Sequence, residues 1–273
     1  SRRGRSSRSS SLFQSGRLRE SAGYRLRISR CCLSIWNTLR VLVPDLFEQG
    51  SAVNSYFEKE SSMDSKKYNF ALFNNSINEF GLTLDDHQIA QFVNYYELLT
   101  EWNRFMNLTA ITEWNDVCTK HFVDSISLCK ALDCTENLSV VDVGTGAGFP
   151  GIPLKIVFPN LKMTLLDSLG KRVKFLNEVI GRLGLENVEA ILGRAEDFAK
   201  PGLLREQFDL CVSRAVANLS TLAEYCLPYV KLDGFFISYK SEKISEEMQT
   251  AQHAIELLGG SVYGQKEFLL PNS

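Results

Sequence analysis

The chain has 273 residues, of which 44% are apolar and 23% are charged, an ordinary composition for a soluble globular protein. Collagen-like, wholly disordered and disulfide-scaffold proteins are excluded, and no apolar run approaches the roughly 18 residues that a membrane-spanning helix needs. The formal net charge of −2 conceals an uneven distribution, because residues 1–62 carry 11 basic and 5 acidic residues, whereas residues 63–273 carry 19 basic and 27 acidic ones.

The N-terminal extension, residues 1–62, begins with thirty Ser/Arg-rich residues that contain a single acid, Glu20. Such a stretch suits an RNA-binding arm, an organelle transit peptide, or a segment that is not part of the working protein. We favour the last interpretation, with Met63 as the natural start and the extension disordered or not native. The transit peptide is the second choice. The expected location is therefore the cytoplasm, with an organelle as the alternative.

The first regular part of the chain, residues 63–135, is predicted to be a small helical cap. Apolar residues repeat at three- and four-residue intervals through residues 70–80, and Gly81 stands where a helix would end. Thr83 is the predicted N-cap of a longer helix, and a third helix is expected over residues 115–132.

Residues 136–273 alternate short apolar strands with helices, which predicts a doubly wound, mostly parallel α/β sheet of Rossmann-like type. Helices are expected over residues 170–183 and 219–230. The predicted strands cover residues 138–143, 162–166, 188–192, 208–212, 234–238 and 261–266. The closing antiparallel strand that such sheets often carry is missing, so we expect a C-terminally truncated sheet.

The seven cysteines form no CxxC pair, and no histidine lies at zinc-finger spacing. We therefore expect neither a metal site nor a disulfide framework. Cysteines used in this way indicate a reducing compartment.

The clearest chemical signal is the segment VDVGTGAGFPG, residues 141–151, in which a strand runs into closely spaced glycines and a helix follows. Glycine lets the backbone approach a ligand closely, and open α/β sheets bind ligands at the carboxyl ends of their strands. A dinucleotide fingerprint would need glycine at position 149, where the chain has Phe149. The pattern is instead that of class I S-adenosylmethionine-dependent methyltransferases. Its candidate cofactor-binding residues are Asp142, Gly144, Gly146 and Gly148.

Three further strand ends are expected to complete the cofactor pocket. Asp167 ends the second strand, where its carboxylate can accept hydrogen bonds from both ribose hydroxyls. Residues 194–197 follow the third strand, where such enzymes commonly contact adenine. Arg214 follows the fourth strand, where the methyl donor meets its acceptor. A plain glycine turn beside solvated charges is the simpler alternative, and the convergence of these strand ends disfavours it.

The segment after the fourth strand, SRAV, also bears on the acceptor atom. It lacks the Asp/Asn-Pro-Pro-Tyr/Phe motif of amino-group methylases, and Cys211 lacks the Pro-Cys context of carbon-5 pyrimidine methylases. An acceptor with a free lone pair and no proton to lose, such as guanine N7, needs neither device. Catalysis would then rest on alignment and proximity, without a dedicated general base.

Several motifs resemble the glucose-inhibited division protein B family, the bacterial small-subunit rRNA guanine-N7 methyltransferases. The similarity extends over about residues 69–271. The motifs that carry it are WNRFMNLTAIT (102–112), KHFVDS (120–125), DVGTGAGFPG (142–151), LDSLGKR (166–172) and SRA (213–215).

The resemblance implies S-adenosylmethionine as cofactor and a guanine in the decoding-region loop of 16S rRNA as acceptor, in naked rRNA or in a precursor of the small subunit. It also implies neither membrane nor metal, and we expect a monomer. By motif match, the cofactor contacts would be Gly144, Phe149, Ala195, Glu196 and Arg214, and Arg214 would also be the catalytic pocket residue.

A basic rim around this pocket is the expected RNA contact, because phosphates need only a local positive patch. The candidates are Lys120, His121, Lys171, Arg172, Arg194 and Lys240. For each of them the alternative is an ordinary solvated charge, and for His121 it is a structural histidine.

Two other functions remain open on the sequence. A small-molecule methyltransferase would use the same cofactor pocket, and the acidic domain favours it slightly. A catalytically silent RNA- or ribosome-binding module is the alternative from another class.

Overall fold

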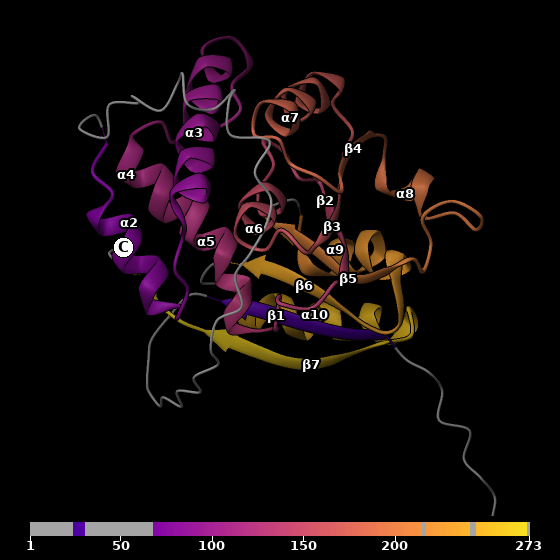
Figure 1. Ribbon diagram of the computed structural model, residues 1–273. Helices are drawn as coiled ribbons and strands as arrows, with labels where there is room; N and C mark the ends of the chain where they lie inside the picture. The colour runs from indigo at the N-terminus through magenta and orange to yellow at the C-terminus, as the bar shows by residue number, and fades with distance from the viewer. Residues whose placement is uncertain (1–23, 31–67, 215–216, 241–243, 272–273) are drawn as a thin grey trace, which may run out of the picture.

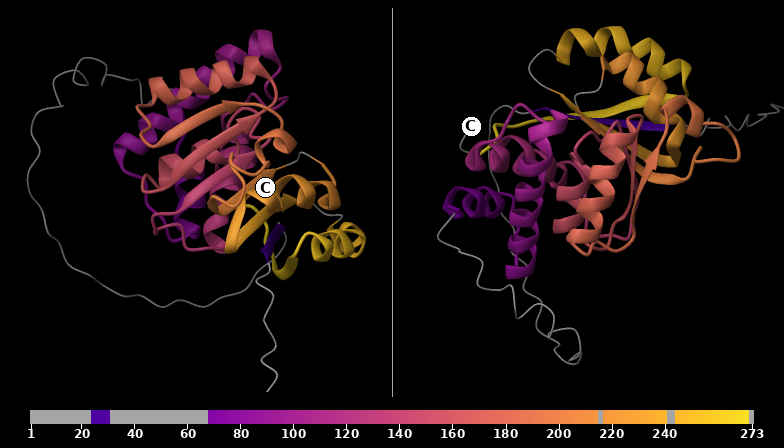
Figure 2. Two further views of the ribbon diagram at one scale, coloured as in Figure 1. Left: turned by 90° about the vertical axis from the view of Figure 1, so that its right-hand side faces the viewer. Right: turned by 90° about the horizontal axis from the view of Figure 1, so that it is seen from above.

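The computed structural model describes residues 24–30, 68–214, 217–240 and 244–271. One central sheet has helices on both faces, and a helical cap, residues 68–130, lies against one of them (Figure 1). Figure 2 shows α9 (Leu219–Cys226) and α10 (Ile244–Leu257) on the face opposite the cap.

The cap begins with α2 (Ala71–Glu79) and α3 (Asp86–Met106). Gly81 follows α2 with a φ of +74°, which confirms its predicted place at the helix end. The predicted N-cap at Thr83 is wrong, because Asp85 caps α3. The Asp85 carboxylate accepts from the backbone N–H of Gln88 at 2.7 Å, and the Gln88 side chain accepts from the N–H of Asp85 at 3.1 Å. This reciprocal box satisfies two N–H groups, and its second half needs the long side chain of Gln88.

The third helix of the cap is irregular rather than the single helix expected over residues 115–132. It runs through α4 (Trp114–Val117), the π-helical segment η1 (Cys118–Val123), α5 (Asp124–Ile126) and the 3-10 segment η2 (Ser127–Lys130). Single π turns inside helices occur often at functional sites.

The sheet has seven described strands in the order β4-β3-β2-β5-β6-β1-β7, and every described pair is parallel. The predicted doubly wound sheet is thereby confirmed. Chain order reverses between β2 and β5, and ligands of such sheets bind at this switch point. The strands are β1 (Tyr24–Arg30), β2 (Ser139–Val143), β3 (Lys162–Asp167), β4 (Val188–Leu192), β5 (Phe208–Arg214), β6 (Val230–Lys240) and β7 (Gly260–Glu267).

The helices that connect the strands are α6 (Gly151–Val157), α7 (Gly170–Arg182), α8 (Ala195–Phe198), α9 and α10. The helix expected over residues 219–230 is shorter, because α9 ends at Cys226 and a 3-10 turn, η3 (Leu227–Tyr229), follows. Pro228 lacks the N–H that a continuing α-helix would use. Strand β6 consequently begins four residues before its predicted start at residue 234.

Strand β1 belongs to the N-terminal extension, for which disorder or a non-native segment was expected, and these seven residues form a strand of the sheet instead. Its residues, YRLRISR, alternate apolar and polar residues, as strands do. β1 pairs with β6 on one side and with β7 on the other, so it occupies the interior of the sheet. The rest of the extension lies outside the described residues.

Two buried clusters hold the layers together. One cluster joins the cap and α6–α7 to the sheet through aromatic residues such as Phe92, Phe122 and Phe175. The other joins α9 and α10 to the opposite face and includes Leu222 and Ile255. Within the described ranges, no helix combines the length and the apolar character that a membrane crossing needs.

Candidate active site

The glycine loop between β2 and α6 forms the floor of the site. Its first residues hydrogen-bond to the end of β3, with the Gly144 N–H donating to the Leu166 carbonyl at 2.9 Å. Gly148 has a φ of +98°, and a Cβ there would lie 2.6 Å from Ile152 Cγ1 and 2.8 Å from the Tyr95 hydroxyl oxygen. Only glycine fits this position without movement of its neighbours. The loop ends at the cis peptide bond between Phe149 and Pro150.

Asp142 is fully buried beneath this loop. Its Oδ2 accepts from the Thr145 hydroxyl at 2.6 Å and from the Gly151 N–H, at the start of α6, at 2.8 Å. Its Oδ1 has no hydrogen-bond partner, and burial raises the pKa of the carboxyl to about 6. The side chain lines neither cavity at the site. Asp142 therefore shapes the glycine loop from below.

Asp167 is an acidic residue at the end of β3 that lines the site. Its Oδ2 accepts from the Gly146 N–H at 2.9 Å and from Arg172 Nη1 at 3.3 Å, and its Oδ1 accepts from the Leu169 N–H at 2.9 Å. The side chain is nearly buried, yet it lines both cavities described below. Asp167 thus links the glycine loop to the start of α7.

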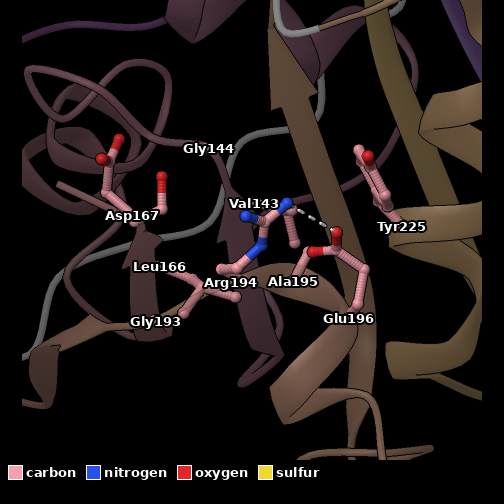
Figure 3. A pocket seen from close by; sticks show the side chains of 10 residues that line it. Val143, Gly144, Leu166, Asp167, Gly193, Arg194, Ala195, Glu196 and Tyr225 are labelled. Atoms are coloured by element: carbon pink, nitrogen blue, oxygen red, sulfur yellow. Dashed lines mark hydrogen bonds and ion pairs between the residues drawn. The ribbon is translucent and has the colours of Figure 1, made fainter.

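A first cavity of about 210 Å³ lies between the carboxyl ends of β2, β3 and β4. Figure 3 shows Asp167 and Tyr225 on opposite sides of it, with the Arg194–Glu196 ion pair, 3.2 Å between charged atoms, between them. The lining residues are Val143, Gly144, Leu166, Asp167, Ser168, Gly193, Arg194, Ala195, Glu196 and Tyr225.

A second cavity of about 470 Å³ adjoins the first and shares Gly144, Asp167 and Ser168 with it. The cap supplies one wall, through Leu108, Thr109 and His121. The glycine loop and α7 supply others, and Arg214 reaches in from the end of β5. The site is therefore built at the contact between the cap and the sheet.

Arg214 is held between the cap and Phe149. Its Nη1 lies 2.7 Å from Asp124 Oδ2, and the side chains of this ion pair are only 13% and 22% exposed. The guanidinium carbon lies 5.0 Å from the centre of the Phe149 ring, a cation–π contact. Burial raises the pKa of Asp124, while the charge of Arg214 opposes this shift.

His121, on the π-helical segment, completes this wall. Its ring stacks on Phe149, with the ring centres 4.6 Å apart, and its Nε2 lies 2.8 Å from the Thr109 hydroxyl. The Arg214 Nη2 atom is 3.4 Å from its Nδ1. Burial and the charge of Arg214 lower the pKa of His121 to about 4, so the ring is neutral at pH 7.

The family described as rRNA small subunit methyltransferase G matches residues 88–270 of this chain. The chain belongs to this family. Its relatives include the ribosomal RNA small subunit methyltransferase G of Lachnoclostridium phytofermentans, 53% identical over 201 residues, which are 74% of this chain and 83% of that protein. The protein of the same name from Alkaliphilus metalliredigens is 54% identical over 195 residues, 71% of this chain and 82% of its own. Among solved structures, a SAM dependent methyltransferase from Aquifex aeolicus covers 56% of this chain and 86% of its own, at 23% identity and a TM-score of 0.40.

In this member of the methyltransferase G family, some of the basic residues predicted to contact RNA line the cavities and others are exposed beside them. Arg172 and His121 line the second cavity and Arg194 lines the first. Lys171 is exposed at the start of α7, and Lys120 is half-exposed and paired with Asp116 at 2.9 Å.

Lys240 differs from the expectation of a basic rim. Its side chain is only 10% exposed, and its Nζ lies 2.7 Å from Glu247 Oε2 and 2.5 Å from the Ala217 carbonyl oxygen. The ammonium group therefore joins β6 to the adjoining α10 and has little surface left for a phosphate.

Thr109 and Tyr225 are among the lining residues that the sequence did not single out as site residues. Thr109 lies in a motif of the family, residues 102–112, from which no site residue was predicted. Tyr225 lies on the helix after β5, where its spacing is that of an ordinary core position. The role of Asp124 as the partner of Arg214 spans 90 residues and has no local signal.

Proposed function

We propose that this chain transfers the methyl group of S-adenosylmethionine to N7 of a guanine in small-subunit rRNA, in the decoding-region loop of 16S rRNA. The observation that carries the proposal is the pair of adjoining cavities at the switch point of the sheet, in a chain of the rRNA small subunit methyltransferase G family.

The first cavity suits the nucleoside of the cofactor. Gly144 of the glycine loop lines it, and Asp167 offers carboxylate oxygens beside Gly144. The methyl group of S-adenosylmethionine is already activated by its sulfonium, so the protein has only to bind and align it. The residues we propose to hold the cofactor are Gly144, Gly146, Phe149, Asp167, Ala195, Glu196 and Arg214, with Gly148 and Asp142 shaping the loop.

The second cavity suits a purine acceptor that loses no proton. Guanine N7 carries a free lone pair, so the site needs no general base and the rate depends on alignment. The neutral His121 ring and the Arg214–Asp124 ion pair keep the net charge of this wall near zero. Such a wall does not repel the positive charge that N7 acquires on methylation.

Transfer of a labelled methyl group tests the proposal. The protein is incubated with labelled S-adenosylmethionine and with naked 16S rRNA, small subunits or a metabolite mixture, and labelled guanines are located by mass mapping. Label at N7 of one rRNA guanine supports the proposal, and the preferred arm identifies naked rRNA or the assembled particle as substrate. Label found only in a small metabolite overturns it in favour of a small-molecule methyltransferase. RNA retained without any transferred label overturns it in favour of a silent RNA-binding module.

We also propose that the enzyme acts in the cytoplasm as a monomer, with small-subunit rRNA as its macromolecular partner. An organelle is the alternative location. Light scattering on the purified chain tests the oligomeric state, and fractionation of cells followed by immunoblotting tests the location.

A further inference from the structure

Phe105, in the last turn of α3, is an exposed aromatic residue that neither cavity uses. Its side chain is 66% exposed, more than any other described phenylalanine, tyrosine or tryptophan. An exposed aromatic ring offers a flat face on which a ligand can stack.

The Phe105 ring packs against Trp102, which in turn packs against Phe175. Its centre lies 5.5 Å from the ring centre of Trp102, which lies 5.6 Å from that of Phe175 on α7. Phe175 is fully buried in the core, and Met106 beside Phe105 is also buried. Supported in this way, the ring loses little conformational entropy when a ligand stacks on it.

Helices α3 and α7 run antiparallel, which brings the end of α3 that carries Phe105 close to the start of α7, where Arg172 lines the second cavity. Gln91, near the start of α3, donates to the Leu183 carbonyl at the end of α7, whereas Trp102 contacts Phe175 in its first half. The last turn of α3 therefore lies beside the first turn of α7, and both helices lie on the same side of the sheet (Figure 1).

The residues that follow Phe105 enter the cavity directly. The chain turns at Asn107, whose φ is +50°, and Leu108 and Thr109 then line the cavity. The Asn103 side chain holds this turn through two hydrogen bonds of 2.9 Å with the backbone of Thr109. The position of the ring is thus coupled to that of the cavity wall.

Basic residues lie on the two helix ends that meet near this aromatic ring. Arg104 precedes it and is exposed, Lys171 is exposed in the first turn of α7, and Arg172 lines the cavity. Unpaired RNA bases stack on aromatic side chains while basic residues contact the neighbouring phosphates. The ring and its charges therefore match one nucleotide of single-stranded RNA.

We propose that Phe105 is a stacking platform for an unpaired base next to the methylated guanine. This inference rests on the proposed rRNA methyltransferase function and goes beyond it, because it assigns a nucleotide contact outside both cavities.

Steady-state methylation by four variants tests the platform. Phe105→Ala and Phe105→Leu should raise the KM for rRNA about tenfold, the loss expected from one base–aromatic contact. Phe105→Tyr should keep the KM within about twofold, because its ring also stacks. Leu257→Ala, at an exposed aliphatic residue of α10 with 73% exposure, is the matched control. Binding of S-adenosylhomocysteine and the thermal midpoint should be unchanged in every variant.

Three results would overturn the platform. One is an unchanged KM in Phe105→Ala. Another is full retention in Phe105→Leu, which would indicate a general apolar contact such as a protein partner. The third is an equal loss in Phe105→Tyr. If the wild-type chain transfers no label to rRNA, the proposed function fails instead. Fluorescence anisotropy with an oligonucleotide of the target loop then decides the platform separately, by the ratio of Kd between Phe105→Leu and wild type.

Discussion

The number of hydrogen bonds that the Asp167 carboxylate can accept limits how it binds a cofactor. A carboxylate has about four lone-pair directions, and the N–H groups of Gly146 and Leu169 and the Arg172 guanidinium already use three. Bonds to both ribose hydroxyls therefore require one protein donor to yield. Arg172, at 3.3 Å, is the weakest of the three and the natural one to move.

We expect Asp167→Asn to weaken S-adenosylhomocysteine binding. The amide removes the charge and turns an N–H toward donors such as the Gly146 N–H, so charge-assisted hydrogen bonds worth roughly 1.5–3 kcal/mol are lost. That corresponds to roughly a tenfold to hundredfold rise in Kd by calorimetry. Asp86→Asn, at an exposed position of α3, is the control. Unchanged affinity in Asp167→Asn would remove this residue from the cofactor site.

His121 makes stability depend on pH in a defined direction. Its pKa is near 6.5 when unfolded and about 4 in the fold, because of burial and the charge of Arg214. The unfolded chain therefore binds more protons between these values, so the stability present above pH 6.5 is lost as pH falls toward 4. The Lys120 carbonyl also contacts the His121 ring, and Asp124 pairs with the Arg214 guanidinium beside it.

Urea unfolding at pH 7 and pH 5 tests this dependence against His121→Gln, which cannot titrate in this range. The wild type should lose about 2 kcal/mol more than the variant between the two pH values. NMR should also find a His121 pKa below 5. Equal losses of stability in both proteins would show that protonation of His121 does not destabilise the fold.

The glycine loop contains a position that only glycine can occupy. Gly148 combines a positive φ with Cβ contacts below 3 Å, whereas Gly181 in α7 has helical backbone and open space where its Cβ would lie. Two chemically identical substitutions should therefore have opposite effects.

We expect Gly148→Ala to destabilise the fold by roughly 2–4 kcal/mol, because a left-handed backbone and overpacking are both penalised. Gly181→Ala should stabilise it by up to about 1 kcal/mol, because alanine favours the helix. Chemical denaturation of the two variants measures both numbers. A tolerated alanine at position 148 would show that the loop relaxes easily and does not preform the site.

At the scale of the whole molecule, β1 lies between β6 and β7 and joins these two strands into one sheet. The pattern of residues 136–273 alone did not predict a strand at this position. Strand β7 pairs with β1 and with no other described strand. An unpaired position would leave backbone N–H and carbonyl groups of β6 and β7 without partners. The integrity of this edge thus depends on a segment more than 200 residues away in the sequence.

Removing β1 should therefore loosen one edge of the sheet and leave the site intact. A chain that begins at Met63 should show faster amide exchange in residues 234–240 and 260–267 and a lower thermal midpoint than a chain that begins at Gly23. Amide exchange in β2 and β3, at the site, should be equal in the two chains. Equal protection of β7 in both would mean that β1 is dispensable for the sheet.

The sequence by itself determined the elements whose signals are local. The glycine spacing after β2, the acid that ends β3, the alternation of strands and helices and the glycine after α2 each follow from backbone geometry within a few residues. These signals were enough to predict the parallel sheet and to gather the candidate cofactor residues at its carboxyl edge.

Only the tertiary structure decided the contacts between distant segments. It placed β1 inside the sheet, paired Arg214 with Asp124, stacked His121 on Phe149 and joined Lys240 to Glu247. Burial and ion pairing depend on which surfaces meet after folding, and no local pattern contains that information. A charged residue in the sequence is therefore only a candidate for binding until its partners in the fold are known.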